Sequence, residues 1–302
     1  MCIVDCLRQL FAEKPSARPP MRERSVLCSS PSGLHRMAYT EWGDPLNPRV
    51  LVCVHGLTRN GRDFDFLAQA LASHYRVICP DLPGRGRSDR LAAAAEYVPP
   101  TYAADLVTLI ARLDVESVDW VGTSLGGLVG MILASQPRSP IRRLVLNDVG
   151  PEISAASLRR IGEYLGSAPR FPSMEDAEKY IRYVSAPFGA LSDEQWRHLT
   201  LYSVRAVAAG GFEMIYDPAI GEPYRTAFLA GDVSFWPLYD AIGCPTLVIR
   251  GAESDLLLRD TALRMKERGP RAQLVEVAGV GHAPMLMNEE QVALVRGFLL
   301  GV

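Results

Sequence analysis

The segment VDWVGTSLGGLVGMILASQ, residues 118 to 136, contains the motif that best indicates the fold of this chain. Its start, VDWV, is a short apolar run typical of a buried strand, and its end, LGGLVGMILASQ, predicts a helix. Between them, Gly122-Thr123-Ser124-Leu125-Gly126 matches the pattern G-x-S-x-G. In this strand-turn-helix context the two glycines permit a tight turn that exposes a serine hydroxyl above a sheet. Ser124 is therefore a candidate nucleophile.

Five further short runs resemble the strand before Ser124, because they are rich in β-branched residues and lack polar alternation. They are RVLVCVHG (49–56), YRVICPD (75–81), RRLVLNDVG (142–150), PTLVIRG (245–251) and AQLVEVAG (272–279). Such runs indicate strands that are covered on both faces, as in a parallel sheet. Segments with helical apolar spacing lie between them, and residues 23–42 predict an edge hairpin. The alternation predicts an α/β fold with a mostly parallel, doubly wound sheet.

The alternation stops between residues 151 and 240, where the apolar spacing is helical and no strand-like run occurs. We expect a helical lid here, inserted after the sixth strand into a core made of residues 23–150 and 241–302. The insertion holds 14 of the 24 aromatic residues. These residues either pack short helices onto the sheet or line an apolar substrate cleft. On the second interpretation, Phe212 and Trp236 are candidates for substrate contact.

Composition limits the classes of function that remain. The 302 residues include 32 Lys and Arg against 34 Asp and Glu, so no overall field attracts nucleic acid or an anionic membrane. No apolar run approaches the ~18 residues needed to span a bilayer. The six cysteines show no C-x-x-C spacing, which favours a reduced, cytoplasmic protein. We expect a monomer or homodimer whose partner is a small-molecule substrate, with no nucleic acid and no integral membrane association.

Residues 1–22 lack the long apolar run of a secretory signal and are expected to form an extension that is separate from the core. Cys2 and Cys6 lie in this extension. Attachment of a lipid or a metal is an alternative to no role at all, and no role is the expectation.

A serine nucleophile needs a base and a carboxylate that orients this base. His282 is the best base among five histidines, because it follows the last predicted strand, where catalytic groups collect in open α/β sheets. Asp255 is the preferred carboxylate and Glu253 the reserve, since both follow the strand PTLVIRG. An N-cap role is the alternative for Asp255. His55, at the end of the run RVLVCVHG, is discussed below. The remaining three histidines are interpreted as surface or packing residues: His35, His74 and His198.

The remaining parts of a hydrolytic site are also represented in the sequence. Backbone N–H groups of Leu57 and Leu125 are candidates for an oxyanion hole, since they follow a strand end and the nucleophile. His55 is expected to brace the loop before Leu57. Arg59 either contacts a substrate carboxylate or is solvated. The run DLPGRGRS (81–88) lacks the spacing of a phosphate-binding loop and predicts a tight structural turn.

Taken together, His55-Gly56, the D-x-x-G-x-G-x-S run at 81–88, G-T-S-L-G-G, Gly251 to Asp255 and Gly281-His282 resemble the α/β-hydrolase superfamily, in the branch that carries a lid. The resemblance covers residues 34 to 300. It implies Ser124 as nucleophile, His282 as base, Asp255 as the orienting carboxylate, and Leu57 with Leu125 as the oxyanion hole. Relatives that act as dehalogenases or epoxide hydrolases carry Asp at the nucleophile position, so Ser124 argues against these activities.

The sequence therefore predicts a serine hydrolase of carboxylesterase type that acts on a small to medium apolar ester through an acyl-enzyme, without cofactor or metal. Two alternatives remain open. One is hydrolysis of a carbon–carbon bond in a diketone-like ring-fission product, for which relatives with a lid use the same triad. The other is a ligand-binding protein of the same fold without turnover.

Overall fold

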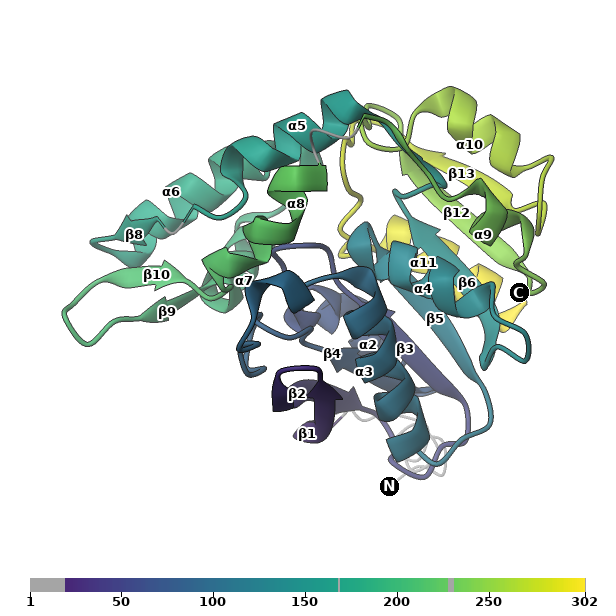
Figure 1. The fold of residues 1–302 in the computed structure, drawn as a ribbon, viewed down its shortest axis with the longest axis horizontal. Coiled ribbons are helices and arrows are strands. Elements are labelled where there is room, and N and C mark those ends of the chain that lie inside the picture. Colours follow the sequence, from purple (N-terminus) through teal and green to yellow (C-terminus); the bar gives the residue numbers. More distant parts are fainter. Residues whose placement is uncertain (1–19, 168, 228–230, 302) are drawn as a thin grey trace, which may run out of the picture.

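The computed structural model describes residues 20–167, 169–227 and 231–301 (Figure 1). Its centre is an eight-stranded sheet of order β1-β2-β4-β3-β5-β6-β12-β13. The strands are β1 (Met21–Ser30), β2 (Gly33–Trp42), β3 (Val50–Val54), β4 (Arg76–Pro80), β5 (Val118–Thr123), β6 (Ile141–Asn147), β12 (Thr246–Gly251) and β13 (Gln273–Val277). The hairpin β1-β2 is antiparallel and joins β4 in antiparallel orientation, whereas the other pairs are parallel. The predicted doubly wound sheet and its edge hairpin are confirmed.

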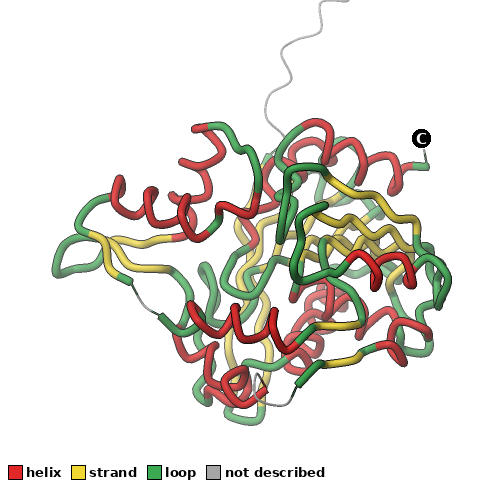
Figure 2. Tube along the Cα trace, turned by 90° about the horizontal axis from the view of Figure 1, so that it is seen from above, coloured by secondary structure: helices red, strands yellow, loops and turns green. Residues whose placement is uncertain are grey.

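Helices cover both faces of this sheet, as the view from above shows (Figure 2). One face carries α3 (Pro99–Arg112), α4 (Leu125–Ala134), α9 (Trp236–Asp240) and α10 (Arg259–Met265), and the other carries α2 (Asp65–Leu71) and α11 (Glu289–Leu300). Each layer encloses its own hydrophobic core. In β5, Trp120 belongs to the core below α3 and α4, while Val121 belongs to the core below α2 and α11. Successive side chains of a strand point to opposite faces, which explains the continuous apolar runs.

The insertion follows β6 and projects from the core beside the carboxyl ends of the parallel strands (Figure 1). Its elements are β7 (Glu152–Ile153), α5 (Ala155–Tyr164), β8 (Arg170–Phe171), α6 (Met174–Val184), η3 (Ala186–Phe188), α7 (Asp193–Ser203), β9 (Val204–Ala206), β10 (Phe212–Met214), η4 (Pro218–Gly221), α8 (Glu222–Ala227) and β11 (Val233–Ser234). Strands β8, β10 and β9 form a small sheet, and β11 pairs with β7. The expectation of a purely helical segment is therefore wrong. Strands of two or three residues are too short to produce a recognisable period in the sequence.

The insertion packs directly onto the loop that follows β13. Phe171, Ile181 and Trp196 of the insertion share a small core with Met285 and Met287 of this loop. Two short 3-10 helices complete the core domain, η1 (Gly61–Phe64) and η2 (Ala94–Glu96). Hydrogen bonds also join the insertion to the η1 region, where Asn60 donates to the Tyr202 carbonyl and His198 Nε2 lies 2.9 Å from the Arg62 carbonyl. The position of the insertion is thus set by contacts with the same loops that carry the candidate functional residues.

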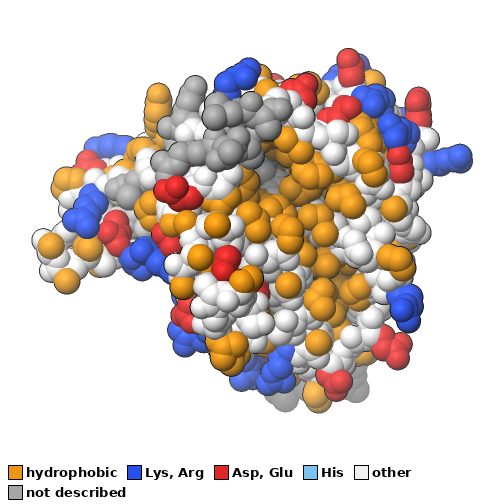
Figure 3. All heavy atoms as spheres, viewed as in Figure 1, with side chains coloured by type: hydrophobic (Ala, Val, Ile, Leu, Met, Phe, Trp, Pro, Cys, Tyr) orange, Lys and Arg blue, Asp and Glu red, His pale blue; other side chains and the backbone are white. Residues whose placement is uncertain are grey.

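The N-terminal boundary differs from the expectation. Strand β1 begins at Met21, so residues 21 and 22 belong to the sheet, while residues 1–19, with Cys2 and Cys6, lie outside the described residues. Within the ranges that the structure describes, no helix combines the length and apolarity that crossing a bilayer requires. On the face shown in Figure 3, acidic and basic side chains are interspersed around a hydrophobic middle region, as expected for a chain of net charge −2.

Candidate active site

Ser124 occupies the sharp turn between β5 and α4. Its backbone lies in an unusual region, with φ 53° and ψ −115°, which a non-glycine residue adopts at a cost. The glycines on either side permit this turn because a Cβ on Gly122 would overlap the backbone of Gly126, and a Cβ on Gly126 would overlap the carbonyl oxygen of Val54. The indole N–H of Trp120 donates to the Gly126 carbonyl at 3.1 Å. The predicted strand-turn-helix context of Ser124 is confirmed.

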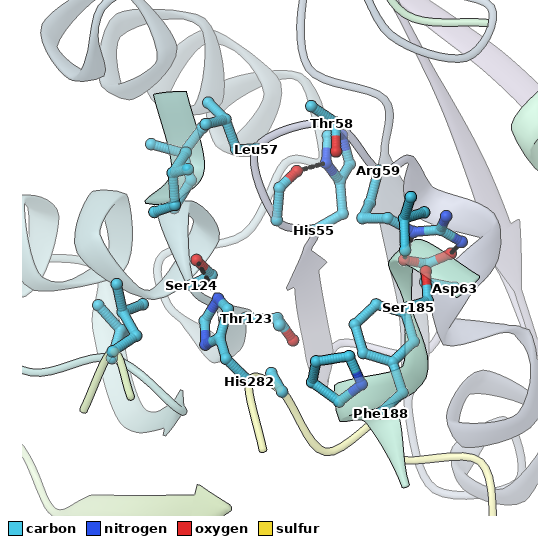
Figure 4. Close-up of a pocket in the computed structure, with 18 of the residues that line it drawn as sticks. His55, Leu57, Thr58, Arg59, Asp63, Thr123, Ser124, Ser185, Phe188 and His282 are labelled. Carbon is cyan, nitrogen blue, oxygen red and sulfur yellow. Dashed lines mark hydrogen bonds and ion pairs between the residues drawn. The ribbon is translucent and has the colours of Figure 1, made fainter. Parts of the chain in front are cut away.

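His282 lies in the loop between β13 and α11, and its ring faces Ser124 (Figure 4). Its Nε2 lies 3.0 Å from Ser124 Oγ, within hydrogen-bond distance. The side chain is largely buried, at 16% exposure. The neighbouring Gly281 donates its N–H to the Pro187 carbonyl of the insertion at 2.7 Å, which ties the loop in place. The structure thus brings together the two residues that the sequence selected as nucleophile and base.

The carboxylate that contacts His282 is Asp148, not Asp255. Asp148 directly follows β6, is fully buried, and its Oδ2 lies 2.7 Å from His282 Nδ1. The same carboxylate accepts hydrogen bonds from Gly251 N at 2.8 Å and Ser254 Oγ at 2.5 Å. Three donors and a buried position hold this group ready to orient the imidazole. With Nδ1–H donated to Asp148, Nε2 is free to accept the proton of Ser124.

The prediction of Asp255 as the partner of His282 is wrong, and the reserve Glu253 also lies at the surface. Asp255 is 54% exposed and pairs with Arg160 of α5 in a bidentate contact, at 2.5 and 2.9 Å. Ser254, one residue earlier, is the member of this loop that reaches the site. The signal that was missed is present in the sequence, since Asp148 stands at the end of the run RRLVLNDVG. Both aspartates follow a strand, and only the loop conformations decide which one faces His282.

Leu57, Leu125 and Ser124 line the same cavity, and Figure 4 shows Leu57 and Ser124 on its wall. Leu125 is the first residue of α4, where N–H groups have no partner within the helix. Within the residues that the structure describes, neither the Leu57 N–H nor the Leu125 N–H has an acceptor. The positive end of the α4 dipole adds to the field at this point. Their role as an oxyanion hole stays a prediction.

The loop that carries Leu57 is held from below by buried polar groups. His55 is fully buried, with Nδ1 2.7 Å from the Gly56 carbonyl and Nε2 accepting the Leu82 N–H at 2.9 Å. Burial lowers the pKa of His55 to about 3, so its ring is neutral. Arg85, also fully buried, donates to the Leu57 carbonyl at 2.9 Å. The DLPGRGRS run is therefore a structural turn that supports this loop, as predicted, and His55 braces it.

A cavity of about 200 Å³ opens beside Ser124 and His282, between the core and the insertion. Its walls are mostly apolar. The main apolar residues from the core are Leu57, Leu125, Leu128 and Val149, and those from the insertion are Leu158, Ile161, Val184, Phe188 and Met214. A polar minority, with Thr58 and Ser185, lies near the pair formed by Arg59 and Asp63 (Figure 4). A mostly apolar lining with a few polar groups is typical of cavities that bind small molecules.

The three predicted substrate contacts have different outcomes. Arg59 lines the cavity, but its guanidinium donates to Asp63 at 2.6 and 2.8 Å and to Ser203 at 2.9 Å. Trp236 and Phe212 are absent from the cavity walls within the described chain, so these two predictions are wrong. Trp236 instead contacts the guanidinium groups of Arg264 and Arg268, which lie over its ring at 4.6 and 4.1 Å from the ring centroid. Aromatic content alone does not indicate which way a side chain faces.

The fold and this arrangement define the class of the protein. Residues 51–294 match the alpha/beta hydrolase family, and the chain belongs to this family. Among curated relatives, it is 53% identical over 283 residues to a 3-hydroxybutyrate-oligomer hydrolase of Cupriavidus necator, an alignment that covers 91% of this chain and 97% of the relative. It is 28% identical over 231 residues to a 2-hydroxymuconate semialdehyde hydrolase of Pseudomonas sp. CF600, covering 76% of this chain and 78% of the relative.

A solved structure supports the same assignment. The crystal structure of an alpha/beta hydrolase from Novosphingobium aromaticivorans is similar to this chain with a TM-score of 0.83 and 36% sequence identity. The match covers 95% of this chain and all of that one. The expected superfamily, fold and hydrolase class are thereby confirmed.

Proposed function

We propose that this protein is a serine hydrolase that cleaves carboxylic esters, with Ser124 as nucleophile, His282 as general base and acid, and Asp148 as the carboxylate that orients His282. The observation that carries this proposal is the continuous chain of contacts Ser124 Oγ, His282 Nε2, His282 Nδ1 and Asp148 Oδ2, at 3.0 and 2.7 Å, on the wall of an apolar cavity. This is the geometry required to activate a serine hydroxyl.

The reaction would proceed in two halves. Ser124 Oγ attacks the acyl carbon while His282 Nε2 takes the hydroxyl proton, and Asp148 stabilises the resulting imidazolium. The N–H groups of Leu57 and Leu125 receive the negative charge on the former carbonyl oxygen. The alcohol leaves with the proton from His282, and an acyl-enzyme remains. Water, activated by the same histidine, then releases the acid and restores Ser124.

The substrate class we propose is short oligomers of 3-hydroxybutyrate. The support is the 53% identity to a 3-hydroxybutyrate-oligomer hydrolase along nearly the whole length of both chains. Such oligomers carry methyl groups along an ester backbone, which suits a small cavity with apolar walls and few polar groups. We further propose that the insertion acts as a lid, since it supplies one wall of the cavity, and that the enzyme acts in the cytoplasm, in keeping with the free thiols of Cys28, Cys53, Cys79 and Cys244.

The test is release of 3-hydroxybutyrate from its linear dimer and trimer, followed by liquid chromatography, for the wild-type protein and Ser124→Ala. We expect turnover by the wild-type protein and a loss of at least about 10³-fold in the variant. Full turnover by Ser124→Ala would refute the mechanism. Turnover of simple p-nitrophenyl esters without turnover of the oligomers would refute only the substrate class.

Two measurements separate the alternatives. A vinylogous diketone of the ring-fission type, assayed side by side with the dimer, tests for carbon–carbon hydrolysis, and the relative with 28% identity is named a 2-hydroxymuconate semialdehyde hydrolase. We expect the diketone to stay intact. A fluorophosphonate probe tests for a reactive nucleophile, because a ligand-binding protein without an activated serine is not labelled.

A further inference from the structure

A cluster of three metal-ligating side chains lies outside the candidate active site, between the edge hairpin and α3. Cys28 of β1 and His35 of β2 are direct cross-strand partners, and Asp105 projects from α3. All three are buried, at 2%, 4% and 1% exposure. Their ligand atoms all lie within 4.8 Å of one another. None of them lines the cavity beside Ser124, within the described part of the chain.

The hydrogen bonds inside this cluster leave polar atoms without partners. His35 Nε2 lies 2.8 Å from Asp105 Oδ2, and Cys28 Sγ makes a weak contact of 3.9 Å with the Asp105 carbonyl. His35 Nδ1 and Asp105 Oδ1 are both buried and, among the described residues, have no partner. Buried polar atoms are nearly always satisfied, because water no longer compensates for a missing bond. Two orphaned atoms in one cluster therefore point to a ligand that binds there.

We propose that Cys28, His35 and Asp105 form a structural site for a thiophilic divalent cation, with Zn²⁺ as the best fit. Thiolate, imidazole and carboxylate are the donors that Zn²⁺ takes in proteins, at about 2.0 to 2.3 Å. To form a tetrahedral shell the three side chains would turn toward a common centre, and a water molecule would fill the fourth position. One thiolate and one carboxylate balance the charge of the cation, which matters because an uncompensated charge is costly in this buried place.

Binding at this site changes the protonation of the thiol. The cation replaces the thiol proton, a sulfur–metal bond forms, and the proton leaves to solvent. The bound cation would then cross-link β1, β2 and α3. Its effect is expected on the stability of the sheet edge rather than on the chemistry at Ser124.

The test uses a full-length parent that carries Cys2→Ser and Cys6→Ser, because these two thiols lie outside the described residues and could bind metal themselves. Zn²⁺ or Co²⁺ is supplied during expression and again during refolding, and unbound metal is removed by desalting. We expect close to one equivalent of metal in the parent. With Co²⁺ we expect thiolate charge-transfer absorption in the near ultraviolet and a rise of several degrees in Tm.

The variant Cys28→Ser is expected to lose the charge-transfer band and the Tm response. Cys244→Ser is the matched control, since Cys244 is partly buried and lies outside the cluster, and it should behave as the parent. The proposal is overturned if the parent retains no metal by either route, or if Cys28→Ser binds Co²⁺ with an unchanged spectrum. The parent measurement alone decides the matter if Cys28→Ser does not fold. In that case, a parent protein without the thiolate charge-transfer band would overturn the proposal. His35 and Asp105 would then form only a buried pair that braces the hairpin.

Discussion

The carboxylate of Asp148 lies 2.7 Å from Nδ1 of His282, although 134 positions separate the two residues in the chain. Asp148 directly follows β6, and His282 follows β13. Between these two strands in the sheet lies β12, whose following loop supplies Gly251 N and Ser254 Oγ to the same carboxylate. The carboxylate of Asp148 thus follows β6, and two of its hydrogen-bond donors, Gly251 and Ser254, lie at the end of the neighbouring strand β12 and in the loop after it.

Replacement of Asp148 by Asn is expected to lower kcat by about 10³- to 10⁴-fold, because an amide holds the imidazole of His282 in the wrong tautomer and does not stabilise its charged form. Asp255→Asn is the matched control. The exposed ion pair between Asp255 and Arg160 contributes about 0 to 1 kcal/mol to the free energy of unfolding. The activity of Asp255→Asn should therefore stay within about threefold of the wild type. Steady-state kinetics on one ester substrate distinguish the two. Equal losses in both variants would contradict the assignment of Asp148.

Ser254→Ala removes one donor from the buried Asp148 carboxylate and is expected to reduce kcat/KM by about tenfold. The hydroxyl of Ser254 also accepts the N–H groups of Leu256 and Leu257, so the loop itself must be checked. Ser254→Thr, which retains a hydroxyl, should restore most of the activity. If Thr does not rescue the Ala variant while thermal unfolding is unchanged, the hydroxyl does not position Asp148.

His55 predicts a pH dependence of stability. Its pKa is about 3 in the folded protein, below the value of about 6.5 in the unfolded chain. Between these values the unfolded state binds the additional proton, so the free energy of unfolding falls by up to about 1.4 kcal/mol per pH unit as the pH decreases below 6.5. Urea unfolding between pH 7 and 4.5 measures this slope. His55→Gln should flatten it, whereas His74→Gln, at an exposed position, should leave it unchanged.

Gly126→Ala is expected to prevent folding or to destabilise the protein by about 4 kcal/mol or more, because the added Cβ would overlap the Val54 carbonyl under the nucleophile turn. Gly243→Ala is the control, since a Cβ at that position meets no atom within 4 Å among the described residues. Soluble yield and Tm are the measurements. A Gly126→Ala protein with the Tm of the control would show that the turn relaxes without this contact.

The candidate site was predictable from the sequence only in part. Ser124 could be identified because its turn is a local motif, in which glycine spacing and the flanking strand and helix lie within twenty residues. His282 could be identified because few histidines compete and only one follows the last strand. The carboxylate could not be identified: the sequence favours Asp255, with Glu253 in reserve, whereas the structure places Asp148 against His282. Asp148 and Asp255 both follow strands of one sheet.

The contacts of the insertion were less predictable still. Its helices could be expected from apolar spacing, but β8, β9 and β10 are too short to show a period. The aromatic-rich composition of the insertion suggests Phe212 and Trp236 as substrate contacts. Composition, however, carries no information about the direction in which a side chain points. The ring of Trp236 in α9 contacts Arg264 of α10 and Arg268, which follows α10, and these contacts exist only once the two segments are packed.

The sequence by itself determined the strand-helix alternation and the nucleophile turn, because these depend on interactions between neighbours in the chain. It also singled out His282, because few histidines compete. The tertiary structure decided which carboxylate meets His282, which side chains line the cavity, and that Cys28, His35 and Asp105 meet beneath α3. The physical reason is that loop direction and burial depend on packing between segments that are distant in the chain, and this packing leaves no periodic trace in the sequence.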